Sequence, residues 1–469
     1  MQLNKVIRCD FKTEVTSISF DSRTVRPGAL FFCLEGAVDG HDFAFQAVLK
    51  GAAAIVSSRP LGLGVPEIIV KDTRAELARA CAAFWGHPEK RLKLVAVTGT
   101  NGKTTTTFVI KSILEDAGHT VGIIGTAFVE YCGKKFPSDL TTPDPTDLYK
   151  IFAEMADCGV EYVIMEASAH AIALRKLEGL TFSVAAFTNL TRDHLDFFKT
   201  MESYAAAKKS LFTGGHILAA AVNVDDELGR EIALECPAPV VSYGCRYPAD
   251  AFAIDLRMSI GGLRYVLNLS DDVAEVKFNL PGRFNMYNTL CAAAVAKALN
   301  IPIRHIVRGI RSVTRVEGRF DVVFTSGCGV IIDFAHTDDG LRNVLGAVRE
   351  FVTGRIITVF GCGGNRDRTK RPIMGRTVCE MSDYAVITSD NPRYEDPMEI
   401  IADIKSGITG DNYEVQPDRK KAIIRALELA GKDDIVVIAG KGAERYQEIK
   451  GVKYEYNDEE FVLGLGDGK

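Results

Sequence analysis

The sequence predicts a three-domain α/β protein, and three observations lead to this fold class. The chain has 469 residues, 47% hydrophobic and 25% charged, which is too long for one ordinary hydrophobic core. Short apolar runs alternate with amphipathic helical patterns along the chain, as they do in sheets covered by helices. A glycine-rich loop near residue 100 follows one apolar run and precedes a helical pattern.

Residues 1–88 form the first predicted domain, a small α/β unit. Its expected strands are short apolar runs at residues 29–34, 52–56 and 67–70. Two amphipathic stretches, at residues 43–50 and 73–84, have the spacing of helices. His87, Pro88 and the charged run 89–91 then interrupt the pattern, which indicates a domain boundary.

Residues 89–315 form the predicted central domain, a parallel sheet covered by helices that carries the glycine-rich loop. Its expected strands are apolar runs at residues 94–97, 162–165, 184–188 and 217–222. Residues 316–469 form the third predicted domain, a doubly wound, Rossmann-like unit. Its expected strands lie near residues 329–333, 356–360, 384–388 and 434–439, between helical patterns such as 341–351 and 419–430.

Charge and composition argue against several classes of protein. The net charge of -5 and the absence of a long basic run predict no nucleic-acid partner and no attraction to anionic membrane. The first residues lack the apolar core of a signal peptide, and no run of about 18 apolar residues follows, so we expect a cytoplasmic protein without membrane insertion. Eleven scattered cysteines without a CxxC pair fit neither a disulfide framework nor a zinc site, and most should be small buried hydrophobes. No obligate protein partner is evident.

The loop from Thr98 to Thr105 has the features that bind a nucleotide phosphate. Glycines let backbone N–H groups close around phosphate oxygens, and the following helix adds the partial positive charge of its N-terminus. Lys103 can neutralise the outer phosphates, and Thr104 can ligate Mg²⁺. Val97 stands where the standard P-loop has its first glycine, so this loop is shorter. The alternative is a glycine turn without a ligand, but we predict ATP binding.

Four further side chains stand out by position. Glu166 ends an apolar run, where open α/β sheets place ligand groups, although a capping or solvated carboxylate is the alternative. His194 follows another run in a polar loop and could ligate a metal or pack in a core. Asn285 and Asn288 are three apart, so on a helix they share a face that could bind a base edge. Capping by Asn285 competes with that role.

Further motifs lie along nearly the whole chain. They are Thr98-Gly-Thr-Asn-Gly-Lys-Thr104, Thr141-Thr-Pro143, Glu166-Ala-Ser-Ala-His170, Thr188 to Asp196, Leu280-Pro-Gly-Arg-Phe-Asn285, Gly361 to Arg368, Asp390-Asn-Pro-Arg393 and Gly440-Lys-Gly-Ala-Glu444. Together these motifs resemble the Mur ligase family. Folylpolyglutamate synthases share the phosphate loop, but we expect no place there for the Asp21-Ser-Arg23 region or for the diamino-acid motif near residue 390.

The resemblance implies an ATP-dependent ligase that forms an amide bond on a nucleotide-linked cell-wall peptide. ATP would phosphorylate the peptide's terminal carboxylate, and an incoming amine would then displace phosphate. The family pattern gives catalytic roles to Lys103, Glu166, His194 and Lys208, with Mg²⁺ held by Thr104, Glu166 and His194. It also implies that carbon dioxide converts Lys208 to N6-carboxylysine, whereas the sequence alone favours a solvated helix lysine there, with Lys209 adjacent.

The resemblance also assigns three groups of binding residues. The ATP group is Gly99, Thr100, Asn101, Gly102, Lys103, Thr104, Thr105, Asn285, Asn288, Arg319 and Asp333. The group expected to bind the UDP-N-acetylmuramoyl-dipeptide is Ser22, His41, Thr141, Thr142, Ser168 and Lys176. The amino-acid group is Arg366, Asp390, Asn391, Arg393, Gly440 and Glu444. Ala169, Lys176, Asp338 and Ala443 depart from the residues usual in the family.

The amino-acid group resembles a pocket for meso-diaminopimelate, whose far end carries an amine and a carboxylate. Arg393 could bind that distal carboxylate in a two-pronged hydrogen bond, Glu444 could accept the distal ammonium, and Arg366 could bind the other carboxylate. We expect lysine to bind more weakly because it would leave the charge of Arg393 unmatched. L-lysine or another diamino acid remains an alternative, as does a nucleotide switch that forms no bond.

Overall fold

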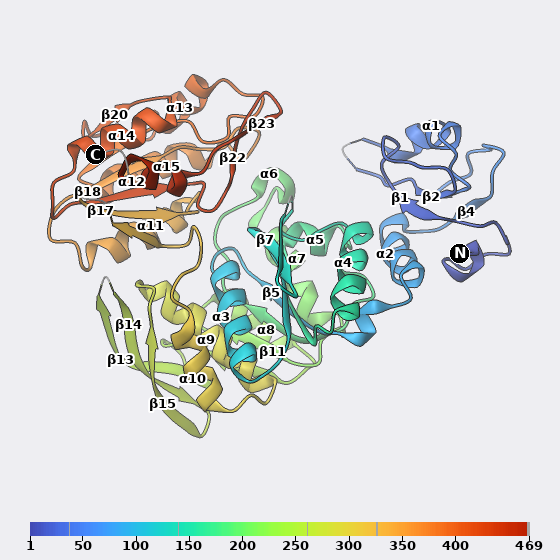
Figure 1. Ribbon diagram of the computed structural model, residues 1–469, viewed down its shortest axis with the longest axis horizontal. Coiled ribbons are helices and arrows are strands. Elements are labelled where there is room, and N and C mark those ends of the chain that lie inside the picture. Colours follow the sequence, from blue (N-terminus) through green and yellow to red (C-terminus); the bar gives the residue numbers. More distant parts are fainter. Residues whose placement is uncertain (37, 139, 260, 325–326, 467–469) are drawn as a thin grey trace.

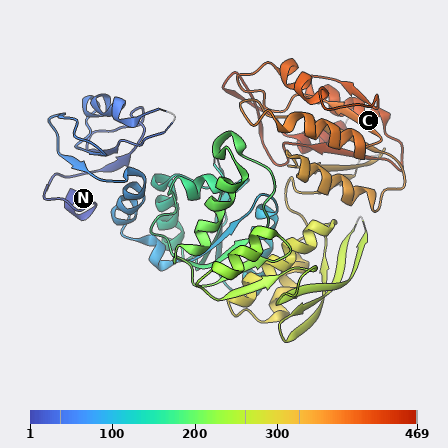
Figure 2. The same ribbon diagram turned by 180° about the vertical axis from the view of Figure 1, so that it is seen from behind.

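The computed structural model describes residues 1–36, 38–138, 140–259, 261–324 and 327–466, and it confirms the three-domain α/β fold. Each domain is built on its own sheet, and the N-terminal and C-terminal domains lie on opposite sides of the central one (Figure 1). The same arrangement is seen from behind in Figure 2. Within the described residues, no helix is both long enough and apolar enough to cross a membrane.

The N-terminal sheet has four parallel strands in the order β1-β2-β3-β4: β1 (Ser17–Ser19), β2 (Ala29–Phe32), β3 (Ala54–Ser57) and β4 (Glu67–Ile69). Helices α1 (Ala44–Leu49) and α2 (Thr73–Phe84) fall within the predicted amphipathic stretches. The Asp72 side chain starts α2 by accepting hydrogen bonds from two backbone N–H groups of the first turn. The short helix η3 (Pro88–Arg91) then leads to the central domain.

The central sheet has eleven strands, and only its middle is parallel. Strands β12 (Val240–Tyr243), β11 (Ala220–Asn223), β10 (Phe182–Phe187), β5 (Lys93–Thr98), β9 (Tyr162–Glu166) and β6 (Val121–Ile124) run parallel in that order. At one end, β13 (Ala251–Ser259) pairs parallel with β12, and β14 (Gly262–Leu269) and β15 (Asp272–Phe278) continue the sheet with antiparallel pairing. At the other end, β7 (Phe128–Tyr131) and β8 (Lys134–Pro137) are antiparallel to their neighbours. The predicted parallel sheet covered by helices is therefore confirmed for the middle of the sheet, and the antiparallel strands at its ends are additions to that prediction.

Helices cover both faces of the central sheet, so alternate residues of β5 pack against helices on opposite faces. Val95 and Val97 belong to the core formed with α3 (Lys103–Asp116), α9 (Arg283–Ala298) and α10 (Ile303–Ser312). Leu94 and Ala96 point to the opposite face. The helices on that side include α4 (Pro145–Asp157), α7 (Met201–Thr213) and α8 (Glu227–Glu235). Short helices α5 (Ala169–Ala173) and α6 (Leu195–Phe198) follow β9 and β10.

The C-terminal sheet has six strands in the order β16-β17-β21-β18-β19-β20. They are β16 (Asp321–Phe324), β17 (Gly329–Asp333), β18 (Ile356–Phe360), β19 (Tyr384–Ile387), β20 (Tyr413–Val415) and β21 (Ile435–Ala439), and only β16 is antiparallel to its neighbour. Helices α11 (Asp338–Arg349), α12 (Lys370–Met381) and α13 (Pro397–Lys405) pack on one face, and α14 (Arg419–Leu429) and α15 (Asp458–Gly466) on the other. A hairpin, β22 (Tyr446–Ile449) and β23 (Val452–Glu455), follows β21.

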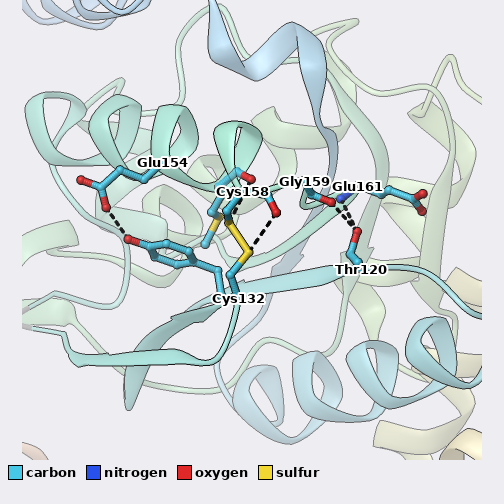
Figure 3. The surroundings of a disulfide bond; sticks show 8 residues. Thr120, Cys132, Glu154, Cys158, Gly159 and Glu161 are labelled. Carbon is cyan, nitrogen blue, oxygen red and sulfur yellow. Dashed lines mark hydrogen bonds between the residues drawn. A yellow bond between two sulfur atoms is a disulfide. The ribbon is translucent and has the colours of Figure 1, made fainter.

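One disulfide corrects the expectation drawn from the cysteines. Cys132, in the turn between β7 and β8, is bonded to Cys158 at the end of α4 (Figure 3). The two residues are 26 apart in sequence and meet only because the hairpin folds beside the helix, so spacing does not reveal the pair. Nearby, the Tyr131 hydroxyl donates to Glu154 on the same helix. Five other cysteines are buried, which is fewer than the expected majority of the eleven: Cys33, Cys81, Cys291, Cys328 and Cys362.

Candidate active site

A cavity of about 1220 Å³ lies where the central and C-terminal domains meet. Its lining includes residues at or just after the carboxyl ends of β5, β9 and β10 in one domain and of β17, β19 and β21 in the other. This is the edge at which open parallel sheets bind ligands. The cavity brings together most of the predicted ATP and amino-acid residues, and also Thr141, Thr142, Ser168 and Lys176. Ser22 and His41 lie in the N-terminal domain and are not part of its lining.

The phosphate loop takes the path that its glycines allow. Gly99 and Gly102 have positive φ angles of 147° and 85°. A Cβ atom on Gly99 would lie 1.8 Å from Thr188 Oγ1, and one on Gly102 would lie 2.3 Å from Asn288 Oδ1. Lys103 begins α3 and donates to the carbonyl oxygens of Gly99 at 3.1 Å and Thr100 at 2.9 Å. Burial lowers the pKa of Lys103.

Glu166 lies against the start of α3. Thr104 Oγ1 donates to Glu166 Oε1 at 2.9 Å, and the backbone N–H and the hydroxyl of Thr126 donate to the same carboxylate at 3.1 and 2.9 Å. Only 1% of Glu166 is exposed, so it is not a solvated charge, and none of these contacts caps a helix. Arg319, from the C-terminal domain, donates to Thr104 Oγ1 at 3.0 Å. Residues of both domains therefore meet on one hydroxyl beside the phosphate loop.

His194 is part of a cluster of histidines around a buried carboxylate. Its Nε2 lies 3.3 Å from Asp193 Oδ2, and its ring packs edge-on against His170 with 4.8 Å between centroids. Burial lowers the pKa of His194 to about 3, so its imidazole is neutral near pH 7 and can act as a metal ligand. Burial raises the pKa of Asp193, but His336 and Lys370 outweigh it and the net pKa is well below its usual range. No group of three or more His, Cys, Asp or Glu in the described ranges is arranged to hold a metal.

Two adjacent lysines of α7 have opposite environments. Lys208 is 1% exposed, and its ammonium lies over the Tyr204 ring, 4.5 Å from the centroid. Burial and the nearby charge of Lys103 lower its pKa well below the ordinary value. Lys209 instead pairs with Glu231 and Glu235 at 3.0 and 2.6 Å, which raises its pKa. The view of Lys208 as a solvated helix lysine is therefore wrong.

The predicted adenosine residues occupy two environments. Asn288 Nδ2 donates to Asn285 Oδ1 at 3.0 Å, so the two side chains share one face of α9 as expected. Asn288 lines the cavity, whereas Asn285 is not part of the lining and its Nδ2 donates to the carbonyl oxygen of Pro281 at 2.7 Å. Asp333, at the end of β17, accepts the backbone N–H groups of Phe320 and Ala335, each at 2.7 Å. Burial raises the pKa of Asp333.

The residues predicted to bind the peptide form a chain of hydrogen bonds beside Glu166. Thr142 Oγ1 donates to the Glu166 carbonyl oxygen at 2.7 Å and accepts from the backbone N–H of Ser168 at 3.1 Å. The Ser168 side chain caps α5. Lys176 pairs with Asp144 at 2.7 Å. In the N-terminal domain, His41 is 5% exposed and is held by Asp39 and Ser58.

At the other end of the cavity, a buried lysine that sequence reasoning missed organises the amino-acid residues. Lys441 Nζ donates to Asn391 Oδ1 at 3.0 Å and to Glu444 Oε2 at 2.8 Å, and its side chain is fully buried. Asn391 Nδ2 also donates to Glu444 Oε2, at 2.8 Å. A Cβ atom on Gly440 would lie 2.6 Å from Asp390 Oδ2, so the chain needs glycine there. Arg366 and Asp390 line the same part of the cavity.

Arg393 is not an unmatched charge. Its Nε lies 3.2 Å from Glu448 Oε2, and its Nη1 donates to the Gly364 carbonyl oxygen at 2.7 Å. The sequence argument against lysine expected a substrate carboxylate as the partner of Arg393, but Glu448 on β22 already pairs with it, so bound lysine would not leave this charge unmatched. The sequence does not reveal the Arg393–Glu448 pair, because the two residues are brought together by the β-bridge between Arg393 and Ile449.

Further contacts between the two domains surround the phosphate loop. Asn101 Nδ2 donates to Asp339 Oδ2, at the start of α11, at 2.8 Å. Arg192 donates to Thr369 Oγ1 at 2.7 Å, and Lys370 Nζ lies 3.7 Å from Asp193 Oδ1. The position of the C-terminal domain is thus tied to the loop that is expected to hold the phosphates.

Comparisons with known proteins identify a family along most of the chain. Models of the Mur ligase family catalytic domain, the Mur ligase middle domain and the Mur ligase glutamate ligase domain match residues 14–91, 97–296 and 318–442. UDP-N-acetylmuramoyl-L-alanyl-D-glutamate--2,6-diaminopimelate ligases are similar over almost the whole chain. The one from Clostridium botulinum is 41% identical, covering 97% of this chain and 95% of its own. That from Halalkalibacterium halodurans is 43% identical, with coverages of 95% and 93%.

Two solved structures are informative about the fold. A UDP-N-acetylmuramoyl-L-alanyl-D-glutamate--2,6-diaminopimelate ligase superposes with a TM-score of 0.70 at 31% identity, over 100% of this chain and 99% of that one. Mycobacterium tuberculosis folylpolyglutamate synthase has a TM-score of 0.66 at 17% identity. It covers 78% of this chain and 92% of its own, and at that identity the likeness concerns the fold alone.

Proposed function

The chain belongs to the Mur ligase family, and from this premise we propose that it joins meso-diaminopimelate to UDP-N-acetylmuramoyl-L-alanyl-D-glutamate with ATP. The names of its relatives give both substrates of this ligase. We place the reaction in the cytoplasm, as a step of peptidoglycan precursor synthesis. One observation carries the proposal: a single cavity is lined by the phosphate loop, by Lys208 and by the Arg393 and Glu444 pocket. A ligase needs ATP, an acyl acceptor and an amine in one space, and this cavity meets that need.

The reaction runs in two steps. An oxygen of the acceptor's terminal carboxylate attacks the γ-phosphorus of ATP, the bond to the bridging oxygen breaks, and ADP leaves. The amine of the amino acid then attacks the acyl carbon, loses a proton, and expels phosphate as the amide bond forms. Lys103 and Arg319 are the cations beside the reacting phosphate, where they stabilise its charge.

Mg²⁺ fits the oxygen donors beside the phosphate loop. The Thr104 hydroxyl and the Glu166 carboxylate are in contact at 2.9 Å, and such oxygen donors are those that Mg²⁺ prefers. His194, neutral near pH 7, would be the third protein group. The ion, when bound, reduces repulsion between the phosphates and the acceptor carboxylate. Thr126 keeps Glu166 oriented through its two hydrogen bonds.

The environment of Lys208 supports carbamylation at that position rather than at Lys209. Carbon dioxide reacts with an uncharged amine, and the lowered pKa of Lys208 makes the uncharged form available. Lys209 stays an ammonium ion because two carboxylates pair with it. The carbamate would supply negative charge near Lys103 and the proposed metal site.

The remaining binding roles are those that the family resemblance implies. Thr141, Thr142, Ser168 and Lys176 would bind the peptide part of the acceptor, and Ser22 and His41 its uridine end in the N-terminal domain. Asn288, Asn285 and Asp333 would bind adenosine. Arg366, Asn391, Arg393 and Glu444 would bind the diamino acid. The Arg393–Glu448 pair favours L-lysine as a second candidate amino acid, because lysine would leave that pair intact.

Phosphate release tests this function against a nucleotide switch. The purified protein is incubated with ATP, Mg²⁺ and UDP-N-acetylmuramoyl-dipeptide, with or without a diamino acid. A ligase releases stoichiometric phosphate only when acceptor and diamino acid are both present. Phosphate release that is independent of both, or no release at all, would contradict the proposal.

A further inference from the structure

Glu448 forms an ion pair with Arg393, the residue that is expected to bind the far end of the amino acid. Arg393 Nε lies 3.2 Å from Glu448 Oε2, and about a fifth of each side chain is exposed, 19% and 21%. Arg393 Nη1 is taken by the Gly364 carbonyl oxygen. Arg393 lines the cavity, whereas Glu448 does not, so Glu448 contacts the arginine from outside the cavity wall.

The backbone of the hairpin fixes Arg393 independently of this carboxylate. Arg393 N donates to the Glu448 carbonyl oxygen at 3.0 Å, and Lys450 N donates to the Arg393 carbonyl oxygen at 2.6 Å. Glu448 N in turn donates to Asn391 Oδ1 at 2.9 Å. Two backbone hydrogen bonds therefore position Arg393, and the third ties Glu448 to Asn391. The Glu448 side chain adds a negative charge to a backbone arrangement that does not depend on it.

We propose that Glu448 is a specificity-determining residue that acts through Arg393 and lowers discrimination between diamino acids with and without a distal carboxylate. The inference rests on the proposed function. With lysine bound, Arg393 keeps Glu448 as its partner, so no guanidinium charge is left uncompensated. With a distal carboxylate bound, two carboxylates share one guanidinium and repel each other. Both effects reduce the preference for a diamino acid with a distal carboxylate over lysine that Arg393 alone would give.

Glu448→Gln tests this inference because glutamine keeps the length and the backbone contacts while removing the charge. Glu414→Gln is the matched control, since Glu414 pairs with Arg425 at 2.9 Å on β20, outside the cavity lining. For each variant, kcat and KM are measured from phosphate release with meso-diaminopimelate and with L-lysine. Melting temperatures verify that each variant is folded.

The E448Q variant should raise the ratio of kcat/KM for diaminopimelate over lysine about tenfold, with KM falling for diaminopimelate and rising for lysine. E414Q should keep the wild-type ratio. Glu448→Asp retains the charge, so its ratio should stay nearer the wild type than that of E448Q. Glu448→Ala also removes the charge and serves as the test if E448Q is unstable. An unchanged or lower ratio in E448Q, or an equal loss with both amino acids, overturns the inference.

The wild-type measurement separates this inference from the proposed function. If the wild type releases phosphate with neither diamino acid, the proposed function fails and the role of Glu448 fails with it. If the wild type is active and only the ratio in E448Q is unchanged, the role of Glu448 alone is refuted.

Discussion

Replacing Lys208 with methionine should stabilise the protein while removing its activity. Lys208 is 1% exposed and lies near the like charge of Lys103, with an aromatic contact to Tyr204. Methionine has a similar length and is apolar, so it fills the same space without an amine. The side chain that is costly to the fold would thus be the one that the reaction requires.

The size and pH dependence of this effect follow from the lowered pKa of Lys208. Replacing a buried ion pair by well-packed apolar groups often stabilises by about 1–4 kcal/mol. For the single buried amine of Lys208 we expect about 2 kcal/mol at pH 7, because the Tyr204 ring offsets part of the cost of burial. In the unfolded chain Lys208 stays protonated up to its ordinary pKa, whereas in the folded chain it loses its proton at a lower pH. Between these two pKa values the unfolded chain binds more protons than the folded one. Wild-type stability therefore rises with pH in that window, and the advantage of K208M shrinks towards pH 10.

Urea unfolding at pH 7 and pH 10, in buffer free of carbon dioxide, measures this difference. Lys209→Met is the control, because Lys209 forms surface ion pairs whose loss should change stability by less than about 1 kcal/mol. Added bicarbonate should stabilise the wild type and K209M but not K208M, and K208M should lose activity about 100-fold or more. A K208M protein that is less stable than the wild type at pH 7, or equally stabilised by bicarbonate, would refute the reasoning.

Three further substitutions test other parts of the structure. Arg319→Gln removes the donor to Thr104 and should lower kcat by about 10²-fold in single-turnover phosphate transfer, whereas an unchanged kcat would place Arg319 outside the reaction. Glu166→Gln should raise the Mg²⁺ concentration for half-maximal activity about tenfold, and an unchanged Mg²⁺ titration would count against a metal ligand there. Asp458→Asn leaves Arg419 buried without its charged partner, so urea unfolding should show a loss of about 3–5 kcal/mol; a loss below 1 kcal/mol would contradict this.

Local features of the site could be predicted from the sequence because they depend on neighbours in the chain. The phosphate loop and Glu166 each follow an apolar strand directly, and the carboxyl end of a parallel strand is where ligand groups lie. Because the phosphate loop and Glu166 follow parallel strands of one sheet, their position in the same cavity could be expected from the strand order. The domain boundaries, at residues 88 and 315, stay predictions.

Other features depend on contacts between distant segments, and the sequence alone did not reveal them. Glu448 meets Arg393 across a strand bridge, and Lys441 is placed between Asn391 and Glu444 by the turn after β21. The antiparallel strands at the ends of the central sheet were missed because a half-exposed hairpin has a weaker apolar signal than a buried parallel strand.

A competition between two amino acids tests the central claim most directly. The protein is given ATP, Mg²⁺, UDP-N-acetylmuramoyl-L-alanyl-D-glutamate and equal concentrations of meso-diaminopimelate and L-lysine, and the products are identified by mass spectrometry. We predict a product whose mass corresponds to the acceptor plus diaminopimelate minus water, in excess over the lysine product. A lysine product in excess would contradict the proposed amino acid, and the absence of any amide product would contradict the ligase itself.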